Sequence, residues 1–212
     1  MDPLTPIEET LSALDDAQRA GKIIYTGVSN LPAWTIAKFN GIATQMGVRP
    51  FASTQNYYSL AGRDLEYDIL PFANSEKVAV LPWSPLAGGF ISGKFRKAQT
   101  SPEDSRRAKF DFPPVNLEKA YQIVDVLESI ANELECTIAQ VALAAIMVQK
   151  GVTSTIIGVK TTEQLIENLK SSEVKTKLTA DHLAQIDAVS KPETIYPYWM
   201  MERQIQGRSP AN

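Results

Sequence analysis

The chain has 212 residues, of which 44% are hydrophobic and 21% are charged, and its formal net charge at pH 7 is −3. This composition is ordinary for a globular domain with one sizeable core. Positive charge is dispersed apart from two short clusters, at 94–97 and 106–109. The chain therefore lacks the concentrated basic surface of a nucleic-acid-binding protein, and we expect no nucleic-acid partner.

The N-terminal segment and the single cysteine bear on the location of the protein. The first ten residues, MDPLTPIEET, are acidic and contain no apolar run, so we expect no secretory signal. The longest apolar run, 141–148, is far shorter than the stretch of about 20 residues that spans a bilayer. Cys136 is the only cysteine, which excludes an internal disulfide and fits a reducing compartment. We expect a cytoplasmic protein without a membrane partner.

Strand and helix patterns alternate along the chain, which is typical of a parallel sheet with crossover helices. The expected strands change from β-branched or apolar residues to polar or Gly-rich ones at their ends, and we expect them to be buried on both faces. They lie at 23–28, 51–55, 77–82 and 153–157. Helices are expected at about 7–21, 33–46, 64–75, 116–134, 138–149, 162–170 and 180–190, with a long loop over 84–114 and no clear period after 190.

Three of the expected helices start with a capping-box signal, in which a hydroxyl residue precedes Glu or Gln by three positions. The pairs are Thr5 with Glu8, Thr137 with Gln140, and Thr161 with Gln164. In the first pair, Pro6 falls where its missing N–H group is harmless. These signals predict where the three helices begin.

Polar residues end the first two expected strands. Ser29 and Asn30 offer hydroxyl and amide groups that could bind a carboxamide such as that of nicotinamide, although the same pair also fits a turn and helix cap. Gln55 must have both ends of its amide bonded if it is buried, so it marks either a ligand or a local turn. Tyr57 and Tyr58 follow, and we expect at least one of them to belong to the core.

The third strand runs into a Gly- and Pro-rich loop. Trp83 could stack on a flat heterocycle, and Ser84 with the N–H groups around Gly88 could approach phosphates. Lys94 adds a positive charge on the same loop. The alternative is an ordinary surface loop.

The fourth strand leads into a helix start suited to a phosphate. The capped start presents N–H groups and the positive end of the helix dipole, with Lys160 beside it. Glu167 and Asn168 lie one to two turns further along. The alternative is a plain amphipathic helix.

Taken together and in this order, the blocks GVSN, QNYYSLAGRDLE, PWSPLAGGFISGK and GVKTTEQLIEN resemble the aldo-keto reductases, especially the bacterial branch related to potassium-channel β subunits. The resemblance spans nearly the whole chain. It implies an α/β fold that is a partial TIM barrel, made of the last four βα units of a (β/α)8 barrel. Residues 1–190 would form this carboxyl-terminal half, and 191–212 an irregular tail.

The resemblance also implies NADP-dependent reduction of aldehydes or ketones, and it assigns cofactor-binding roles by motif. The residues similar to carboxamide and nicotinamide contacts are Ser29, Asn30, Gln55 and Trp83. Those similar to pyrophosphate contacts are Ser84, Leu86, Gly88 and Lys94. Those similar to contacts of the adenosine 2′-phosphate and adenine are Gly158, Lys160, Gln164, Glu167 and Asn168. Many family members have Arg where this chain has Lys160 and Gln164. The resemblance therefore implies a preference for NADP over NAD less firmly.

In the family, catalysis uses a Tyr acid with Lys, Asp and His, all from the first four strands of the barrel. None of the chain's motifs matches that group, so we expect no catalytic residue, no metal, and no activity from the chain alone. His182 is expected to be an exposed or helix-cap residue, and Cys136 a packing residue. A half barrel also leaves two open sheet edges, so we expect a homo-oligomer; a carbonyl substrate would bind only to a completed barrel. The alternative is a non-catalytic nucleotide-binding or assembly module acting with a partner chain.

Overall fold

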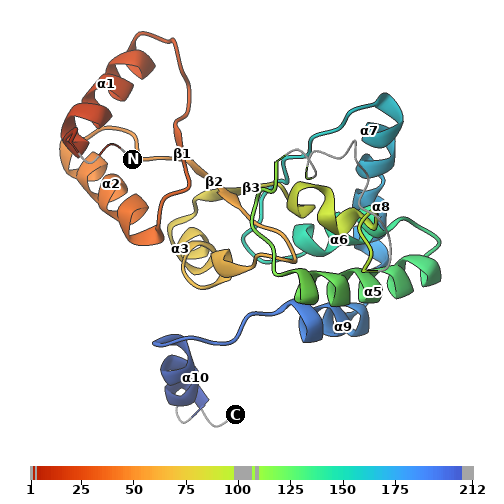
Figure 1. The fold of residues 1–212 in the computed structure, drawn as a ribbon. Helices are drawn as coiled ribbons and strands as arrows, with labels where there is room; N and C mark the ends of the chain where they lie inside the picture. Colours follow the sequence, from red (N-terminus) through yellow and green to blue (C-terminus); the bar gives the residue numbers. More distant parts are fainter. Residues whose placement is uncertain (1, 3, 98–106, 108–109, 207–212) are drawn as a thin grey trace.

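The computed structural model describes residues 2, 4–97, 107 and 110–206. Its sheet contains three strands, β1 (Gly27–Ser29), β2 (Ser53–Tyr57) and β3 (Ala79–Trp83), which are parallel and adjacent in chain order (Figure 1). Ser29 is opposite Gln55, and Tyr57 is opposite Trp83. The prediction of a parallel sheet with crossover helices is confirmed for these three strands.

The fourth expected strand, 153–157, does not form a continuous ladder. Its segment lies parallel to β3 through two isolated bridges, Val80 with Val152 and Trp83 with Ile156. Two features of the sequence account for this. Pro82 has no N–H group to donate, and the N–H group of Val80 bonds the Thr153 hydroxyl at 3.2 Å instead of a backbone carbonyl. The segment still occupies the fourth position of the sheet.

The expectation that the strands are buried on both faces is wrong. In β2, Thr54 and Asn56 are buried whereas Gln55 is exposed, and in β1 both Gly27 and Ser29 are exposed. The buried face packs against helices, and Val80 on this face belongs to the main core. The residues that point to the opposite face are exposed or half-buried, so the burial pattern alternates as in a half-covered sheet.

The two N-terminal helices, α1 (Ile7–Arg19) and α2 (Ala33–Met46), pack together beside the sheet (Figure 1). They share a small core that contains Leu11, Phe39 and Phe51. The capping box predicted for α1 is wrong. Pro6 takes the N-cap position, so Thr5 lies one residue too early, and its hydroxyl donates to Asp2 at 2.6 Å.

The larger core includes Val80 of β3 and is centred on α6 (Ile138–Met147), which packs against α5 (Leu117–Glu133) and α8 (Ser171–Lys177). Residues 140–146 of α6 are all buried. Helix α9 (Ala180–Ser190) packs against α5. The capping box of Thr137 and Gln140 at the start of α6 is confirmed.

Several elements differ from the sequence prediction. The helix expected at 64–75 is divided into the 3-10 turn η1 (Asp64–Glu66) and α3 (Ile69–Glu76). The loop 84–114 contains the 3-10 turn η2 (Ala87–Ser92). Helix α8 was not predicted because its sequence, SSEVKTK, offers Val174 as its one apolar residue and hence no apolar period.

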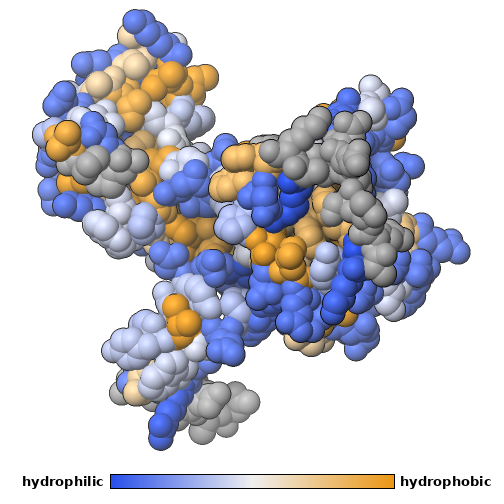
Figure 2. Space-filling view, viewed as in Figure 1, coloured by the Kyte–Doolittle hydropathy of each residue, from blue (hydrophilic) through white to orange (hydrophobic). Residues whose placement is uncertain are grey.

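The segment after residue 190, where no regular element was predicted, includes α10 (Tyr198–Gln206). It stands away from the other helices at the end of an extended connection (Figure 1). The Tyr67 hydroxyl donates to the Glu193 carbonyl at 2.7 Å, and the rings of Tyr67 and Tyr198 stack at 6.1 Å. Apolar residues of α10 remain exposed, which explains the lack of a core-facing period (Figure 2).

Within the described residues, no single helix is both long enough and apolar enough to cross a membrane. The pair α5 and α6, bent by 100°, passes the same test of length and composition only when the two helices are taken together. No group of three or more His, Cys, Asp or Glu side chains suited to a metal ion occurs in this part of the chain.

Candidate cofactor-binding site

The candidate site is built at the carboxyl ends of the three parallel strands. Ser29 ends β1, Gln55 lies opposite it in β2, and Trp83 ends β3. In parallel α/β folds this edge of the sheet is where ligands bind, because the loops that follow the strands converge there. The structure therefore brings together four predicted residues, since Asn30 directly follows Ser29.

A shared backbone carbonyl joins the first two strand ends. The Ser29 hydroxyl donates to the Gln55 carbonyl at 2.7 Å, and the Asn30 N–H group donates to the same oxygen at 3.1 Å. The Ser29 oxygen keeps lone pairs that can accept from a ligand amide. The Gln55 side chain is exposed at the same edge. The expectation that burial forces Gln55 to bond both ends of its amide therefore does not apply.

Asn30 and Trp83 orient each other. The indole N–H group of Trp83 donates to the side-chain oxygen of Asn30 at 2.8 Å. Asn30 has a φ of 56°, a left-handed conformation that Asn tolerates better than most residues. Because its oxygen is bonded to Trp83, its NH2 group is the end that can donate to a carboxamide oxygen.

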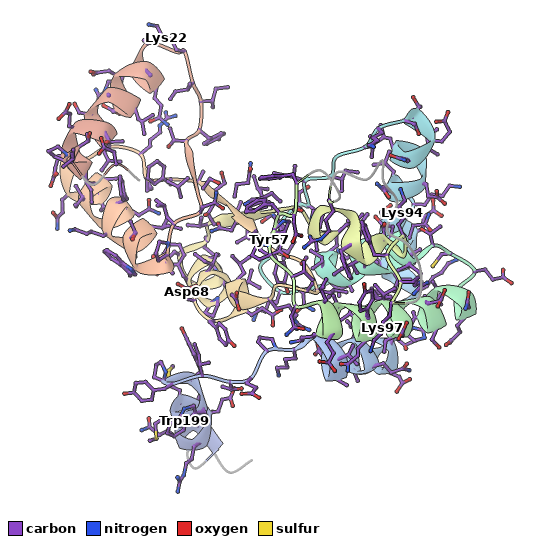
Figure 3. All side chains as sticks on the ribbon, in the orientation of Figure 1. Lys22, Tyr57, Asp68, Lys94, Lys97 and Trp199 are labelled. Atoms are coloured by element: carbon purple, nitrogen blue, oxygen red, sulfur yellow. The ribbon has the colours of Figure 1, made fainter. Side chains whose placement is uncertain are left out.

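The alternative that Ser29 and Asn30 cap α2 is not what the structure shows. The N-cap position of α2 is Pro32, and no side chain of this turn caps the helix. Instead, the Asp68 carboxylate, which comes from the start of α3, accepts from the Ala33 N–H group at 3.1 Å (Figure 3). The two polar side chains are thus left at the site.

Aromatic rings surround Trp83. Tyr57 lies 5.1 Å from it, tilted by 40°, and Phe112 lies 5.7 Å from it with the two rings within 14° of parallel. The Tyr57 hydroxyl is 2.8 Å from the Ser59 hydroxyl, and burial raises the pKa of Tyr57 (Figure 3). Tyr58 is fully buried, which confirms that one of the two adjacent tyrosines belongs to the core.

The residues assigned to the pyrophosphate form a compact turn. The Ser84 hydroxyl accepts from the Gly88 N–H group at 2.9 Å, and the Leu86 carbonyl accepts from the Gly89 N–H group at 2.9 Å. Gly88 has a φ of 67°, and a Cβ there would lie 2.7 Å from the Phe112 carbonyl oxygen, so this position needs glycine on both counts.

Lys94 is separated from this turn. It is exposed and follows Gly93, which packs closely against Ile138 at the start of α6. In Figure 3, Lys94 lies toward α6 and α8, whereas Tyr57 lies at the strand ends. The structure therefore does not bring Lys94 into the cluster around Trp83.

The residues assigned to the adenosine end lie around the start of α7 (Thr162–Leu169). The Thr161 hydroxyl accepts from the Gln164 N–H group at 3.3 Å, but the Gln164 side chain accepts from the Lys160 N–H group at 2.9 Å. The predicted capping box is therefore half formed. The bridge between Trp83 and Ile156 places Gly158 two residues beyond the end of β3.

Further contacts define the surroundings of α7. Gln140 of α6 donates to the Glu167 carbonyl at 2.8 Å and so fixes this helix to the main core. Asn168, in the next position, is half-buried. Hydrogen bonds from its own N–H group and from Thr161 lower the pKa of the exposed Glu163 carboxyl. A negative charge is thus already present at this helix start.

Two residues that contact the site were not predicted. Arg107 is 7% exposed and donates to the carbonyls of Ala87 and Pro113, at 3.0 and 2.9 Å. Phe112 contacts Trp83 with its ring and Gly88 with its carbonyl. Neither Arg107 nor the segment FDFPP (110–114) gave a signal for these contacts in the sequence, because the contacts depend on the path of a long loop.

The two residues for which no functional role was expected have structural ones. His182 caps α9: its Nδ1 atom accepts from the Thr179 N–H group at 3.3 Å, and its Nε2 atom lies 3.2 Å from Glu133. The helix-cap prediction is confirmed, although the residue is buried rather than exposed. Cys136 is half-buried beside the main core, and burial raises the pKa of its thiol.

Comparison with known proteins identifies the family. The model of the aldo/keto reductase family matches residues 1–191, so the chain belongs to this family, whose fold is the TIM barrel. A similar protein is the versiconal hemiacetal acetate reductase of Aspergillus parasiticus, 29% identical over 93% of this chain and 57% of its own length.

Two bacterial proteins are also similar. The uncharacterized oxidoreductase YrpG of Bacillus subtilis is 32% identical over 82% of this chain and 52% of its own length. Protein tas of Escherichia coli is 34% identical over 92% of this chain and 56% of its own length. The chain thus spans about half the length of the curated relatives that it matches.

Proposed function

We propose that this chain is the NADP(H)-binding, carboxyl-terminal half of a carbonyl reductase and supplies the last four βα units of its barrel. The observation that carries the proposal is the hydrogen bond from Trp83 to Asn30 at the carboxyl edge of the sheet, beside Ser29 and Gln55. An aromatic face next to amide and hydroxyl groups is the chemistry that a nicotinamide with its carboxamide requires.

Each residue would have a distinct task. The Asn30 NH2 group would donate to the carboxamide oxygen, and Ser29 and Gln55 would accept from its NH2 group. Trp83 would support one face of the nicotinamide ring. The bound cofactor would supply a hydride, and the opposite face would be left open to the carbonyl carbon of a substrate. The turn of Ser84, Leu86 and Gly88 would lie under the pyrophosphate without a contribution from Lys94.

At the other end of the dinucleotide, Lys160 and the start of α7 would bind the adenosine 2′-phosphate. Gln164 already holds the backbone of Lys160 in place. Glu167 and Asn168 would lie against the adenine, and Gly158 leaves room, since nothing lies within 4 Å of a Cβ built there. Lys160 would be the residue that distinguishes NADP(H) from NAD(H), and its charge would have to outweigh that of the nearby Glu163 carboxylate.

The names of the similar proteins, two of which are a reductase and an oxidoreductase, support carbonyl reduction as the reaction of the complete barrel.

The catalytic acid and its partner residues would come from the other half of the barrel, so the chain alone should not turn over substrate. General acid catalysis contributes about 10² to 10⁴-fold to such rates. Purified chain with NADPH and a reactive aldehyde should oxidise no NADPH above background, and a robust rate would contradict this.

Calorimetric titration with NADPH tests the binding proposal directly. The chain should bind one equivalent, and Trp83→Leu should weaken binding by about tenfold through loss of stacking and of the contact with Asn30. Trp199→Leu is the matched control, because Trp199 lies on α10 (Figure 3), and it should leave affinity within about twofold. Failure of the parent chain to bind NADPH would exclude the proposed function.

A second candidate is a non-catalytic nucleotide-binding or assembly module that acts with a partner chain. The observation in its favour is the exposed edge strand β1, which offers backbone groups to another strand. The genomic sequence upstream of codon 1 separates the two candidates. An open frame encoding strands with the Asp, Tyr, Lys and His residues would support the reductase, and its absence would support the module.

A further inference from the structure

We propose that Phe112 occupies the cofactor's place on Trp83, so that NADP(H) must displace the strap 110–113 in order to bind. The inference rests on the proposed function, because it concerns the same two contact points. It adds a competing group from the chain itself, which the motifs of the site do not reveal.

The first contact is with the nicotinamide position. The rings of Phe112 and Trp83 are 14° from parallel with centroids 5.7 Å apart, which is the offset stacking that a flat nicotinamide would adopt on the indole. The nicotinamide cannot insert between these two rings and still react, since hydride transfer requires one of its faces to be open to the carbonyl. The Phe112 ring must therefore leave this stack.

The second contact is with the pyrophosphate position. The Phe112 carbonyl lies so close to Gly88 that a Cβ on this residue would be 2.7 Å from the oxygen. A pyrophosphate approaching Gly88 would meet this carbonyl, which is itself the negative end of a dipole. Phe112 thus lies over both the nicotinamide position and the pyrophosphate position of the predicted site.

Arg107 holds the strap in this position. Its buried guanidinium donates to Ala87 on one side and to Pro113 on the other, and it forms an ion pair with Asp111 at 2.7 Å. It also lies over the Phe90 ring, 5.4 Å from the centroid. The ion pair balances the charge of the Asp111 carboxylate, so the strap opposes the cofactor by its shape.

The Phe112 ring is 40% exposed, so little core packing opposes its release. Release of the ring costs the aromatic contact with Trp83, and movement of the strap backbone also breaks the contacts of Arg107 with Asp111 and Pro113. An aromatic pair of this kind corresponds to about a two- to tenfold change in affinity. The strap would therefore weaken cofactor binding without preventing it.

The test compares Phe112→Leu with the parent chain, because leucine keeps an apolar side chain and removes the stacking ring. Calorimetric titration should show NADPH binding about two- to tenfold tighter in the variant. Tyr196→Leu removes another exposed ring, on the connection to α10, and should leave the affinity unchanged. Equal or weaker binding by Phe112→Leu would overturn the inference while leaving the proposed function intact.

A second measurement checks the strap in the absence of cofactor. With Trp34→Phe and Trp199→Phe, Trp83 is the only tryptophan, and acrylamide should quench it more strongly when Phe112→Leu is added. Unchanged quenching would show that Phe112 does not cover Trp83 in solution and would also overturn the inference. If neither the parent nor the variant bound NADPH, the proposed function itself would fail, and the inference with it.

Discussion

Trp83 and Asn30 lie 53 residues apart in the sequence, and a 2.8 Å hydrogen bond from the indole N–H group to the amide oxygen joins them. Because the bond fixes which end of the Asn30 amide faces the site, it determines which ligand atom that amide can recognise. The carboxyl ends of β1 and β3 are thereby held as one unit.

Asn30→Asp separates the two roles of Asn30. Aspartate tolerates the left-handed backbone and still accepts from Trp83, so stability should change little. NADPH binding should weaken by about fivefold, because the donor to the carboxamide oxygen is lost. NADP+ should be weakened less, since its nicotinamide ring is positively charged and the new carboxylate lies beside it. Calorimetry with both forms measures the ratio, and equal losses would contradict this placement of Asn30.

Lys160→Met tests the adenosine end. If the ammonium group binds the 2′-phosphate, its removal should weaken NADPH binding by about tenfold and NADH binding by no more than about twofold. Lys160→Arg should retain the preference. Lys170→Met, on the exposed C-terminal side of α7, is the control for a general loss of positive charge. A parallel loss of affinity for both cofactors would place the 2′-phosphate elsewhere.

The sequence predicted the site better than its surroundings. Ser29, Asn30 and Trp83 end a strand or follow one, and Gln55 lies two residues before the end of β2. Parallel strands bring such residues to one edge regardless of detailed packing. The contacts of Phe112 and Arg107 depend on the path of a long loop, which has no period to read. The interruption of the fourth strand could not be predicted for a similar reason. Pro82 disrupts the ladder only with the strand that its nitrogen faces, and the sequence does not show which strand that is.

Arg63 has a structural role that the motif QNYYSLAGRDLE does not reveal. It is 4% exposed within QNYYSLAGRDLE, and it bonds Glu66 of η1 and Asp187 of α9, 124 residues away. Arg63→Met should lower the free energy of unfolding by about 3 kcal/mol, because it leaves two carboxylates without their partner. Arg19→Met removes an exposed pair with Asp15 and should leave the free energy of unfolding nearly unchanged. Urea denaturation of both variants makes the comparison, and similar losses would contradict a role for Arg63 in joining η1 to α9.

Tyr58 belongs to the same cluster and should make stability fall at high pH. Burial and the neighbouring Glu66 raise the pKa of Tyr58 well above its usual value. The unfolded chain releases this proton at about pH 10. Above that pH the unfolded state binds fewer protons than the folded state, so the free energy of unfolding decreases as pH rises. Tyr58→Phe should make the decrease shallower, at the cost of about 1 kcal/mol at pH 7 for the lost hydrogen bond to Glu66.

The control for this pH dependence is Tyr25→Phe, since Tyr25 is 78% exposed. Its profile from pH 7 to pH 11, followed by urea denaturation, should coincide with that of the parent chain. A profile of Tyr58→Phe that also coincided with the parent would show that Tyr58 does not control the loss of stability.

The open edge of the sheet predicts how the chain behaves on its own. β1 pairs with β2 on one side, and the residues before it, Ile24 and Tyr25, are exposed apolar side chains. Unpaired edges of this kind associate with other strands, and closing a barrel removes them. We expect the isolated chain to form a homodimer or a larger assembly, with β1 of one copy beside the 152–156 segment of another, unless the other half of the barrel is supplied.

Sedimentation velocity at micromolar concentration should show this self-association. The double variant Ile24→Lys and Tyr25→Lys should shift the chain toward the monomer, because charge at an edge opposes pairing, whereas Leu4→Lys should not. A parent chain that sediments as a monomer and unfolds cooperatively would mean that the edge is protected within the chain itself.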